Sequence, residues 1–532
     1  VDNVGTGIEG ANALSSIGGR AALRWEPTTA MDLQLLIIHE DSQPEDSALT
    51  NPDRGDFIRF TDRPDLFQSE FTSYNFSLDY DFGFANLTSS STYSDIAGNF
   101  IVDLAGTFNQ AIPFALDAVG YDDIFVQELR LASTDGGNWD WIVGGFYFNK
   151  RRDVVFEYRS SQEFLDARGL TGLPDEYYQR FTNYTDQIES AIFGELTYRF
   201  SDEFWVTGGL RQTNTEVQTF VNGGGYNSNY LGVALGGFTN IPLTVTPIPA
   251  SEGLKVDADK LSYKLSASWK PSEMLTTYAS VSTGFRSPVA NARAGLPSAV
   301  DPSDLVIPDG AKSDTLTNYE VGVKGLFMNG KLGANLAAYY IDWEDIQVQA
   351  NRLSDTVQFA TNIGAAVSQG LEFEVAAYPS DSLSFFLAGS LNDTEVTELT
   401  ASEAAISGAE EGISLAFPSF QGSATVRYDF KVGEGTDAFF AATASYVGDF
   451  PGLFPNVPGQ PNTTAPTFDY TEEYTVVNLQ TGFGRDQWKV TGYVENLFDD
   501  KSISYVHPEA FLDGRYARLR PMTVGVRVGY EY

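Results

Sequence analysis

The sequence contains no cysteine and only two histidines, His39 and His507. The absence of cysteine excludes disulfide bonds, thiolate zinc sites and cysteine nucleophiles, and it fits an oxidising compartment. Histidine is the commonest general base, so its scarcity leaves little material for catalysis. Carboxylates are plentiful, but none is set among apolar neighbours that would separate the pKa values of an acid and a base. We therefore expect no enzyme activity, no cofactor and no metal site.

Basic residues are also scarce, with 33 Lys and Arg against 71 Asp and Glu and a formal net charge of −38. Such a chain repels polyanions and gains nothing from counterion release, which excludes nucleic acid as a partner. Nowhere does the chain carry about 18 consecutive apolar residues, so it has no transmembrane helix. The chain could still cross a membrane with β-strands, because a spanning strand needs only about 9–11 alternating residues.

Aromatic residues and glycine are abundant, at 14% and 50 residues, which suits strands and turns better than helices. The chain ends on MTVGVRVGYEY, residues 522–532, whose period of two places Val524, Val526 and Val528 on one face. Similar segments recur along the chain, separated alternately by a short turn and a long loop. The clearest pair is TLTNYEVGVKGLF and KLGANLAAYYIDW, which meet at Asn329-Gly330, a strong hairpin signal. The pattern predicts roughly nineteen strands with short turns at one end and long loops at the other.

The two faces of each segment differ in polarity. In TNYEVGVKG, Tyr319, Val321 and Val323 share one face, and Glu320 and Lys324 lie on the other. One strand alone cannot distinguish a membrane barrel from a soluble sandwich. So many strands without a break in composition favour closure into one barrel, which also removes the sheet edges that lipid forbids. We predict an all-β, antiparallel, up-and-down transmembrane β-barrel that occupies residues 1–532 as a single domain.

Several stretches carry a resemblance to a known family, namely GGRAALRWEPT, QELRLAS followed by WIVGGFYF, YASVSTGFRSP, GLEFEVAAYPSDSLSFFLAGSLNDTE, VENLFDDK and GVRVGYEY. In this order and spacing the chain resembles the barrel of TonB-dependent outer-membrane receptors, especially those of sphingomonad- and caulobacter-like proteobacteria. The resemblance implies the outer membrane of a Gram-negative cell, with its lipid and lipopolysaccharide. It also implies energy coupling by TonB, ExbB and ExbD, and a terminal aromatic, here Tyr532, that the barrel-assembly machinery recognises.

Receptors of this kind have about 22 strands and a plugged lumen, and their plug precedes the barrel. Residues 1–16 resemble an outer loop instead, and no TonB box is found in them. We therefore expect the chain to be the C-terminal portion of a longer receptor that lacks the plug and roughly three strands. On this view the first strand, Ile17 to Glu26, does not pair with the terminal strand, Arg518 to Tyr532.

The resemblance implies uptake of a scarce ligand, of which a ferric siderophore is the commonest. Cobalamin, oligosaccharides and aromatic compounds use the same scaffold, and a passive pore or a surface-interaction barrel is the alternative class. Aromatic and guanidinium side chains in the outer loops are the expected ligand contacts, because rings stack on flat ligands and Arg pairs with carboxylates. The candidates are Arg286, Arg293, Trp343, Tyr505, His507, Arg515 and Tyr516.

Two further motifs resemble ligand-binding patterns, but we do not expect either to bind a ligand. Gly5-Thr-Gly-Ile-Glu-Gly10 matches the dinucleotide pattern, but it has no strand before it and no helix after it, so we expect a loop. The acidic run from Glu40 to Asp46 lacks the alternating spacing of a calcium loop. We expect it to be a solvated strand rim.

Overall fold

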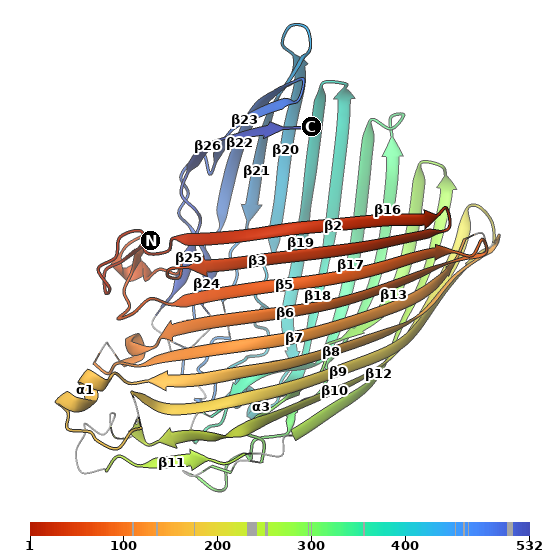
Figure 1. The fold of residues 1–532 in the computed structure, drawn as a ribbon. Coiled ribbons are helices and arrows are strands. Elements are labelled where there is room, and N and C mark those ends of the chain that lie inside the picture. Colours follow the sequence, from red (N-terminus) through yellow and green to blue (C-terminus); the bar gives the residue numbers. More distant parts are fainter. Residues whose placement is uncertain are drawn as a thin grey trace.

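The fold is an all-β barrel, as the sequence predicts. The computed structural model describes residues 1–108, 111–134, 137–174, 176–230, 233, 242–250, 254–295, 297–298, 301–354, 357–452, 454–460, 463–465, 468–507 and 514–531. In these residues nineteen long strands pair antiparallel, each with the next along the chain, and curl into a barrel (Figure 1). The long loops gather at one end and the short turns at the other.

The barrel strands are β2 (Leu14–Thr28), β3 (Met31–Pro44), β5 (Leu66–Asp81), β6 (Ala85–Asp103), β7 (Ala115–Ser133), β8 (Trp139–Arg159), β9 (Tyr177–Arg199), β10 (Phe204–Ser228), β12 (Leu254–Ser272), β13 (Leu275–Phe285), β16 (Thr315–Phe327), β17 (Leu332–Asn351), β18 (Gln358–Ser380), β19 (Leu383–Glu398), β20 (Phe420–Lys431), β21 (Thr436–Val447), β22 (Tyr474–Arg485), β23 (Trp488–Glu495) and β26 (Thr523–Tyr530). Short elements decorate the outer loops: β1 (Asp2–Asn3), η1 (Pro52–Arg54), β4 (Ile58–Arg59), η2 (Ala105–Phe108), α1 (Gln162–Ala167), β11 (Val245–Ile248), β14 (Val289–Ala290), β15 (Gly310–Ala311), α3 (Ala401–Ser407), β24 (Ile503–Val506) and β25 (Tyr516–Arg518). Within the described residues, no helix is both long enough and apolar enough to cross a membrane.

The alternating faces lie as the period of two predicts. Val321 is 56% exposed on the outer surface, where the barrel presents its apolar side chains. Glu320, one residue earlier, accepts a hydrogen bond from the hydroxyl of Tyr278 at 2.5 Å on the opposite face. The hairpin at Asn329-Gly330 also forms, with positive φ angles of 58° and 82° at these two residues. A primed turn of this kind matches the twist of the strands that it joins.

Three neighbouring strands extend further than the sequence pattern suggested. The stretch 216–256 is rich in glycine, asparagine and proline, which predicts a loop, but β10 continues to Ser228 and is 25 residues long. Its register with β9 runs from Trp205 opposite Arg199 to Asn227 opposite Gln179. The reason is the β-branched and aromatic alternation of Thr215-Glu-Val-Gln-Thr-Phe-Val221, which continues the strand. The strands β8 and β9 are similarly long, at 21 and 23 residues, so a wall of sheet rises beside the outer mouth.

The terminal strand is shorter than the predicted span of 518–532. It begins at Thr523, after Pro521, because proline has no N–H to give to the ladder. Residues Tyr516–Arg518 form the separate strand β25, which pairs with β24. Tyr532, the proposed assembly signal, lies outside the described residues.

The ladders run in sequence from β2 to β26. Leu23 of β2 pairs with Leu35 of β3, and Val526 of β26 pairs with Gly492 of β23. No ladder between described residues joins β2 to β26. That further strands stand between them in a longer receptor stays a prediction.

Among the described residues, apolar packing is concentrated in the outer loops, where three clusters are buried. The first joins Ile112, Leu165, Tyr178 and Tyr230 above β8, β9 and β10. The other two are built around Ile346 and Ile307, at the outer ends of β17 and β18. These clusters give the outer loops a fixed shape around the mouth of the barrel.

Candidate functional site

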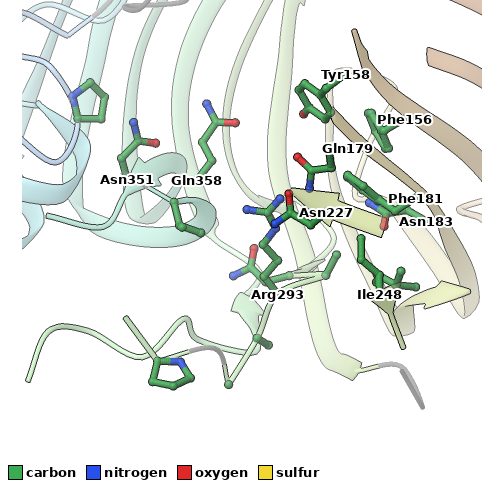
Figure 2. Close-up of a pocket in the computed structure, with 18 of the residues that line it drawn as sticks. Phe156, Tyr158, Gln179, Phe181, Asn183, Asn227, Ile248, Arg293, Asn351 and Gln358 are labelled. Carbon is green, nitrogen blue, oxygen red and sulfur yellow. The ribbon is translucent and has the colours of Figure 1, made fainter. Parts of the chain in front are cut away.

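A cavity of about 1170 Å³ lies in the outer mouth of the barrel. One side of it is the wall of β8, β9 and β10. The other side is formed by Asn351 and Gln358, at the facing ends of β17 and β18, and by residues 457–460. Residues 291–295 and Pro297 lie between the two sides, where Arg293 is seen in Figure 2. The cavity is large enough for a drug-sized ligand, since such sites usually measure about 300–1,000 Å³.

Three rings line the strand side of the cavity, and we call them the aromatic wall: Phe156 and Tyr158 of β8 and Phe181 of β9. Phe156 and Phe181 are register partners, with ring centroids 5.2 Å apart and an interplanar angle of 26°. Tyr158 is stacked on Phe181 at 6.4 Å. Phe156 and Tyr158 are two residues apart on one strand, so they share the face that looks into the lumen. The wall can therefore stack on a planar ligand.

Carboxamide side chains supply most of the polar atoms around the cavity, among them Gln179, Asn183, Asn227, Asn351 and Gln358. The Oδ1 atom of Asn183 is buried and has no hydrogen-bond partner among the described residues. A buried acceptor of this kind is costly unless a donor reaches it. Among the described residues that line the cavity there is no Asp or Glu, although the chain has 71 of them.

Arg293 is the one positive charge among the described residues that line the cavity. It is exposed, and within the described structure it makes no ion pair and no hydrogen bond. Its neighbour Asn291 is buried and holds the segment in place through both atoms of its amide group. The Nδ2 atom donates to Ala360 O at 2.8 Å and to Pro308 O at 3.1 Å, and Oδ1 accepts from Ala360 N at 2.8 Å. The guanidinium is thus presented from a fixed backbone.

Two other predicted residues, Arg286 and Trp343, both donate hydrogen bonds to the carboxylate of Asp314. The Nε atom of Arg286 donates to Asp314 Oδ2 at 2.6 Å, and Trp343 Nε1 donates to the same oxygen at 3.0 Å. The guanidinium carbon of Arg286 also lies 4.9 Å from the ring centroid of Trp343. Burial raises the pKa of Asp314, but the hydrogen bonds from Arg286 and Trp343 outweigh it and hold the pKa below its usual value. Arg286 lines a smaller neighbouring cavity of about 380 Å³.

The four predicted residues of the last loop lie apart from the cavity. Arg515 is buried and pairs with Asp65, with Nη1 2.7 Å from Oδ2. Tyr516 donates through its hydroxyl to Asp469 at 3.1 Å. The rings of Tyr505 and His507 meet edge to face, 6.4 Å apart. The structure therefore separates the seven candidates into three groups, and whether each contacts a ligand stays a prediction.

The aromatic wall and the carboxamides were missed at the sequence level. They lie on strand positions that look like any other alternating stretch, VVFEYR in β8 and RFTNYT in β9. The signal that was present is length, because the alternation continues well past the roughly ten residues that a membrane strand requires. The described residues contain no group of three or more His, Asp or Glu arranged to hold a metal ion.

The barrel and its outer cavity have the fold of an outer-membrane receptor. The chain belongs to the family described as TonB dependent receptor-like, beta-barrel, whose model matches residues 14–497. Proteins of this family lie in the outer membrane of Gram-negative bacteria and work with TonB, and they are transporters and receptors rather than enzymes.

Solved structures show the same fold at low sequence identity. The ferric yersiniabactin uptake receptor FyuA from Yersinia pestis is 17% identical, with a TM-score of 0.75 over 100% of this chain and 73% of its own. The siderophore receptor PiuA from Acinetobacter baumannii is 13% identical, with a TM-score of 0.71 over 98% and 75%. The copper transporter OprC is 12% identical, with a TM-score of 0.68 over 99% and 73%. Because these three differ in what they carry, the fold does not define the ligand.

Proposed function

We propose that this chain is the barrel of a TonB-dependent transporter that takes up a ferric siderophore across the outer membrane. The ligand binds in the outer cavity and passes through the lumen when TonB, with ExbB and ExbD, acts on a plug. The observation that carries the proposal is a cavity whose described lining has no carboxylate and includes the unpaired Arg293, in a chain of net charge −38. Among known lineages we place the protein with the receptors of sphingomonad- and caulobacter-like bacteria, on the stretches quoted above.

The chemistry of the cavity favours an anionic ligand with a flat ring. Arg293 offers a charge-assisted fork for a carboxylate or catecholate oxygen. The aromatic wall offers a stacking surface, and Asn183 offers a buried acceptor for a ligand N–H or O–H group. In this proposal the ligand itself carries the iron, as a siderophore complex does.

The carboxamides favour one second candidate, an oligosaccharide. Amide groups both donate and accept hydrogen bonds, as vicinal hydroxyls require, and the aromatic wall would stack on a sugar ring. In this case Arg293 contributes little to affinity unless the sugar is acidic.

The test measures binding to the purified protein in detergent by quenching of tryptophan fluorescence. The probes are the ferric complex of 2,3-dihydroxybenzoate and a neutral maltooligosaccharide. Arg293→Gln removes the charge from the cavity, and Arg485→Gln, at the short-turn end of β22, is the matched control. A charge-assisted hydrogen bond contributes about 1.5–3 kcal/mol, so we expect roughly tenfold to hundredfold weaker binding of the ferric probe by Arg293→Gln alone.

The possible results separate the alternatives. Binding of the sugar but not of the ferric probe supports the second candidate. Binding of neither, together with passive leakage of both probes through the protein in liposomes, would replace the transporter with a diffusion pore.

A further inference from the structure

The strands β2 and β26 are the two ends of the described ladder. Among the described residues, β2 pairs only with β3 and β26 pairs only with β23. Nineteen strands that alternate in direction leave the first and the last parallel to each other. These two strands therefore cannot form the antiparallel pairing that is used elsewhere in the barrel. We call the interval between β2 and β26 the seam.

Above the seam, the outer loops on its two sides pair with each other. The backbone of Thr50, in the loop after β3, forms an antiparallel bridge with Tyr516, in the loop before β26. Thr50 N donates to Tyr516 O at 2.8 Å, and Tyr516 N donates to Thr50 O at 3.0 Å. The side chain of Asn51 adds a bond from Nδ2 to Gly514 O at 3.1 Å. These contacts join segments that are 466 residues apart in the sequence.

A buried network of charges lies beneath this bridge. Arg59, Asp65 and Arg515 are 0%, 2% and 3% exposed. Asp65 forms ion pairs with both guanidinium groups, and its Oδ2 atom is 2.7 Å from Nη1 of Arg515. The second carboxylate, Asp46, is 3.2 Å from Nε of Arg59.

Backbone groups complete the network. Asp65 N donates to Asp46 Oδ1 at 2.9 Å, and Asp103 N donates to Asp65 Oδ1 at 2.6 Å. Arg515 also donates to the backbone oxygen of Asp103, at the outer end of β6. Buried ion pairs are strongly destabilised by the loss of one partner, because the other charge is then left uncompensated in a poorly solvated place. Arg515 therefore connects the last loop to two segments on the far side of the seam.

We propose that these groups form a rim clamp, made of the Thr50–Tyr516 bridge and the Arg59, Asp46, Asp65 and Arg515 network, which holds the outer rim together across the seam without strand pairing. The clamp fixes the distance between the two sides at the outer end. At the level of the membrane, no ladder between described residues joins the same two sides. Arg515 acts in the clamp as a structural cation.

The absence of native cysteine allows a direct test by cross-linking. Thr50 and Tyr516 exchange both backbone hydrogen bonds, so their Cα atoms are expected about 5.5 Å apart, within the range of a disulfide. The variant Thr50→Cys/Tyr516→Cys in the outer membrane should cross-link on mild oxidation and migrate faster than its reduced form. Leu23→Cys/Val526→Cys, at the level of the wall, should stay reduced.

The positive control is Val490→Cys/Val528→Cys, a register pair of the β23–β26 ladder. Cross-linking at the rim but not at the wall supports the proposal. A cross-link between Leu23→Cys and Val526→Cys, or none between Thr50→Cys and Tyr516→Cys while the positive control reacts, overturns it.

A second measurement tests whether the charged residues of the clamp, and not the introduced cysteines, determine how readily the rim cross-links. In the Thr50→Cys/Tyr516→Cys background, Arg515→Met and Asp65→Asn should each reduce the rate of cross-linking at least tenfold, and the combination should reduce it little further. Arg515→Lys should restore part of the rate. Independent, additive effects of the two substitutions would show that Arg515 and Asp65 do not act together.

Discussion

The ring of Tyr278 on β13 lies directly over Gly322 on β16. The two residues are register partners, and a Cβ atom at Gly322 would come within 2.5 Å of the ring. The hydroxyl of Tyr278 is held by Glu320, so the ring is not free to move aside. A missing side chain on one strand thus makes room for an aromatic ring on its neighbour.

We therefore predict that Gly322→Ala destabilises the barrel by about 1–3 kcal/mol, the usual cost of overpacking. Gly208, a strand glycine with no atom within 4 Å of its added Cβ, is the matched control and should tolerate alanine. The measurement is the urea midpoint of the heat-modifiable folded form on a gel. In a Tyr278→Ala background the effect of Gly322→Ala should largely disappear. If it persists there unchanged, the contact with Tyr278 is not its cause.

Asp314 is expected to organise the outer end of β16. Asp314→Asn removes the charge shared by Arg286 and Trp343, so the loop 286–314 should become more sensitive to trypsin at neutral pH. The folded-state pKa of Asp314 is lowered, so its carboxylate contributes stability above its usual pKa, and this contribution is lost as the pH falls through the lowered folded-state value. Protease resistance in the wild type that does not differ from that of Asp314→Asn at pH 7 would contradict this prediction.

His507 should make the last loop sensitive to mild acid. Burial, and then the charge of Arg515, lower the pKa of His507 below 6.5, so the folded state holds the ring neutral. The unfolded chain binds a proton more readily, and the stability of the loop should fall as the pH drops from about 7 through the range near 6.5.

The measurement for His507 is the rate of proteolysis of the outer loops at pH 7 and pH 5. His507→Gln should flatten this dependence, while His39→Gln, on the exposed face of β3, should leave it in place. A dependence that survives His507→Gln would assign the effect to other groups.

The terminal residue is predicted to matter for assembly and not for ligand binding. Deletion of Tyr532, or its change to Asp, should leave the chain unassembled in the periplasm, because the end strand is what the assembly machinery recognises. The readout is the fraction of heat-modifiable protein in the outer membrane. Tyr530→Phe, which keeps the ring that packs against Trp488 at 4.9 Å, serves as the control. Normal surface amounts without Tyr532 would make it an ordinary lipid-facing residue.

Much of the barrel can be predicted from the sequence, because a strand that crosses the membrane alternates apolar and polar residues over about ten positions. The faces around Glu320 and the hairpin at Asn329 follow from local rules alone. The outer half depends on partners far apart in the chain. Asp46 belongs to an acidic run that was expected to be solvated, and it is buried because Arg59 folds back onto it. No local sequence pattern predicts an ion pair between residues so far apart in the chain.

The candidate site shows the same division. Arg293 was predicted from its charge and its place in a loop, and it lines the main cavity. Asp314 was not predicted, because only the folded loop brings it to Arg286, 28 residues earlier. The aromatic wall was not predicted, because its strands continue beyond the membrane with the same two-residue alternation that they have inside it.

The construction of that wall has an evolutionary consequence. Its rings stand on alternate positions of a paired sheet, so each can be exchanged while the backbone beneath keeps its hydrogen bonds. A lineage could then change what it imports by point substitution on a rigid lattice, without the insertions and deletions that reshaping a loop demands.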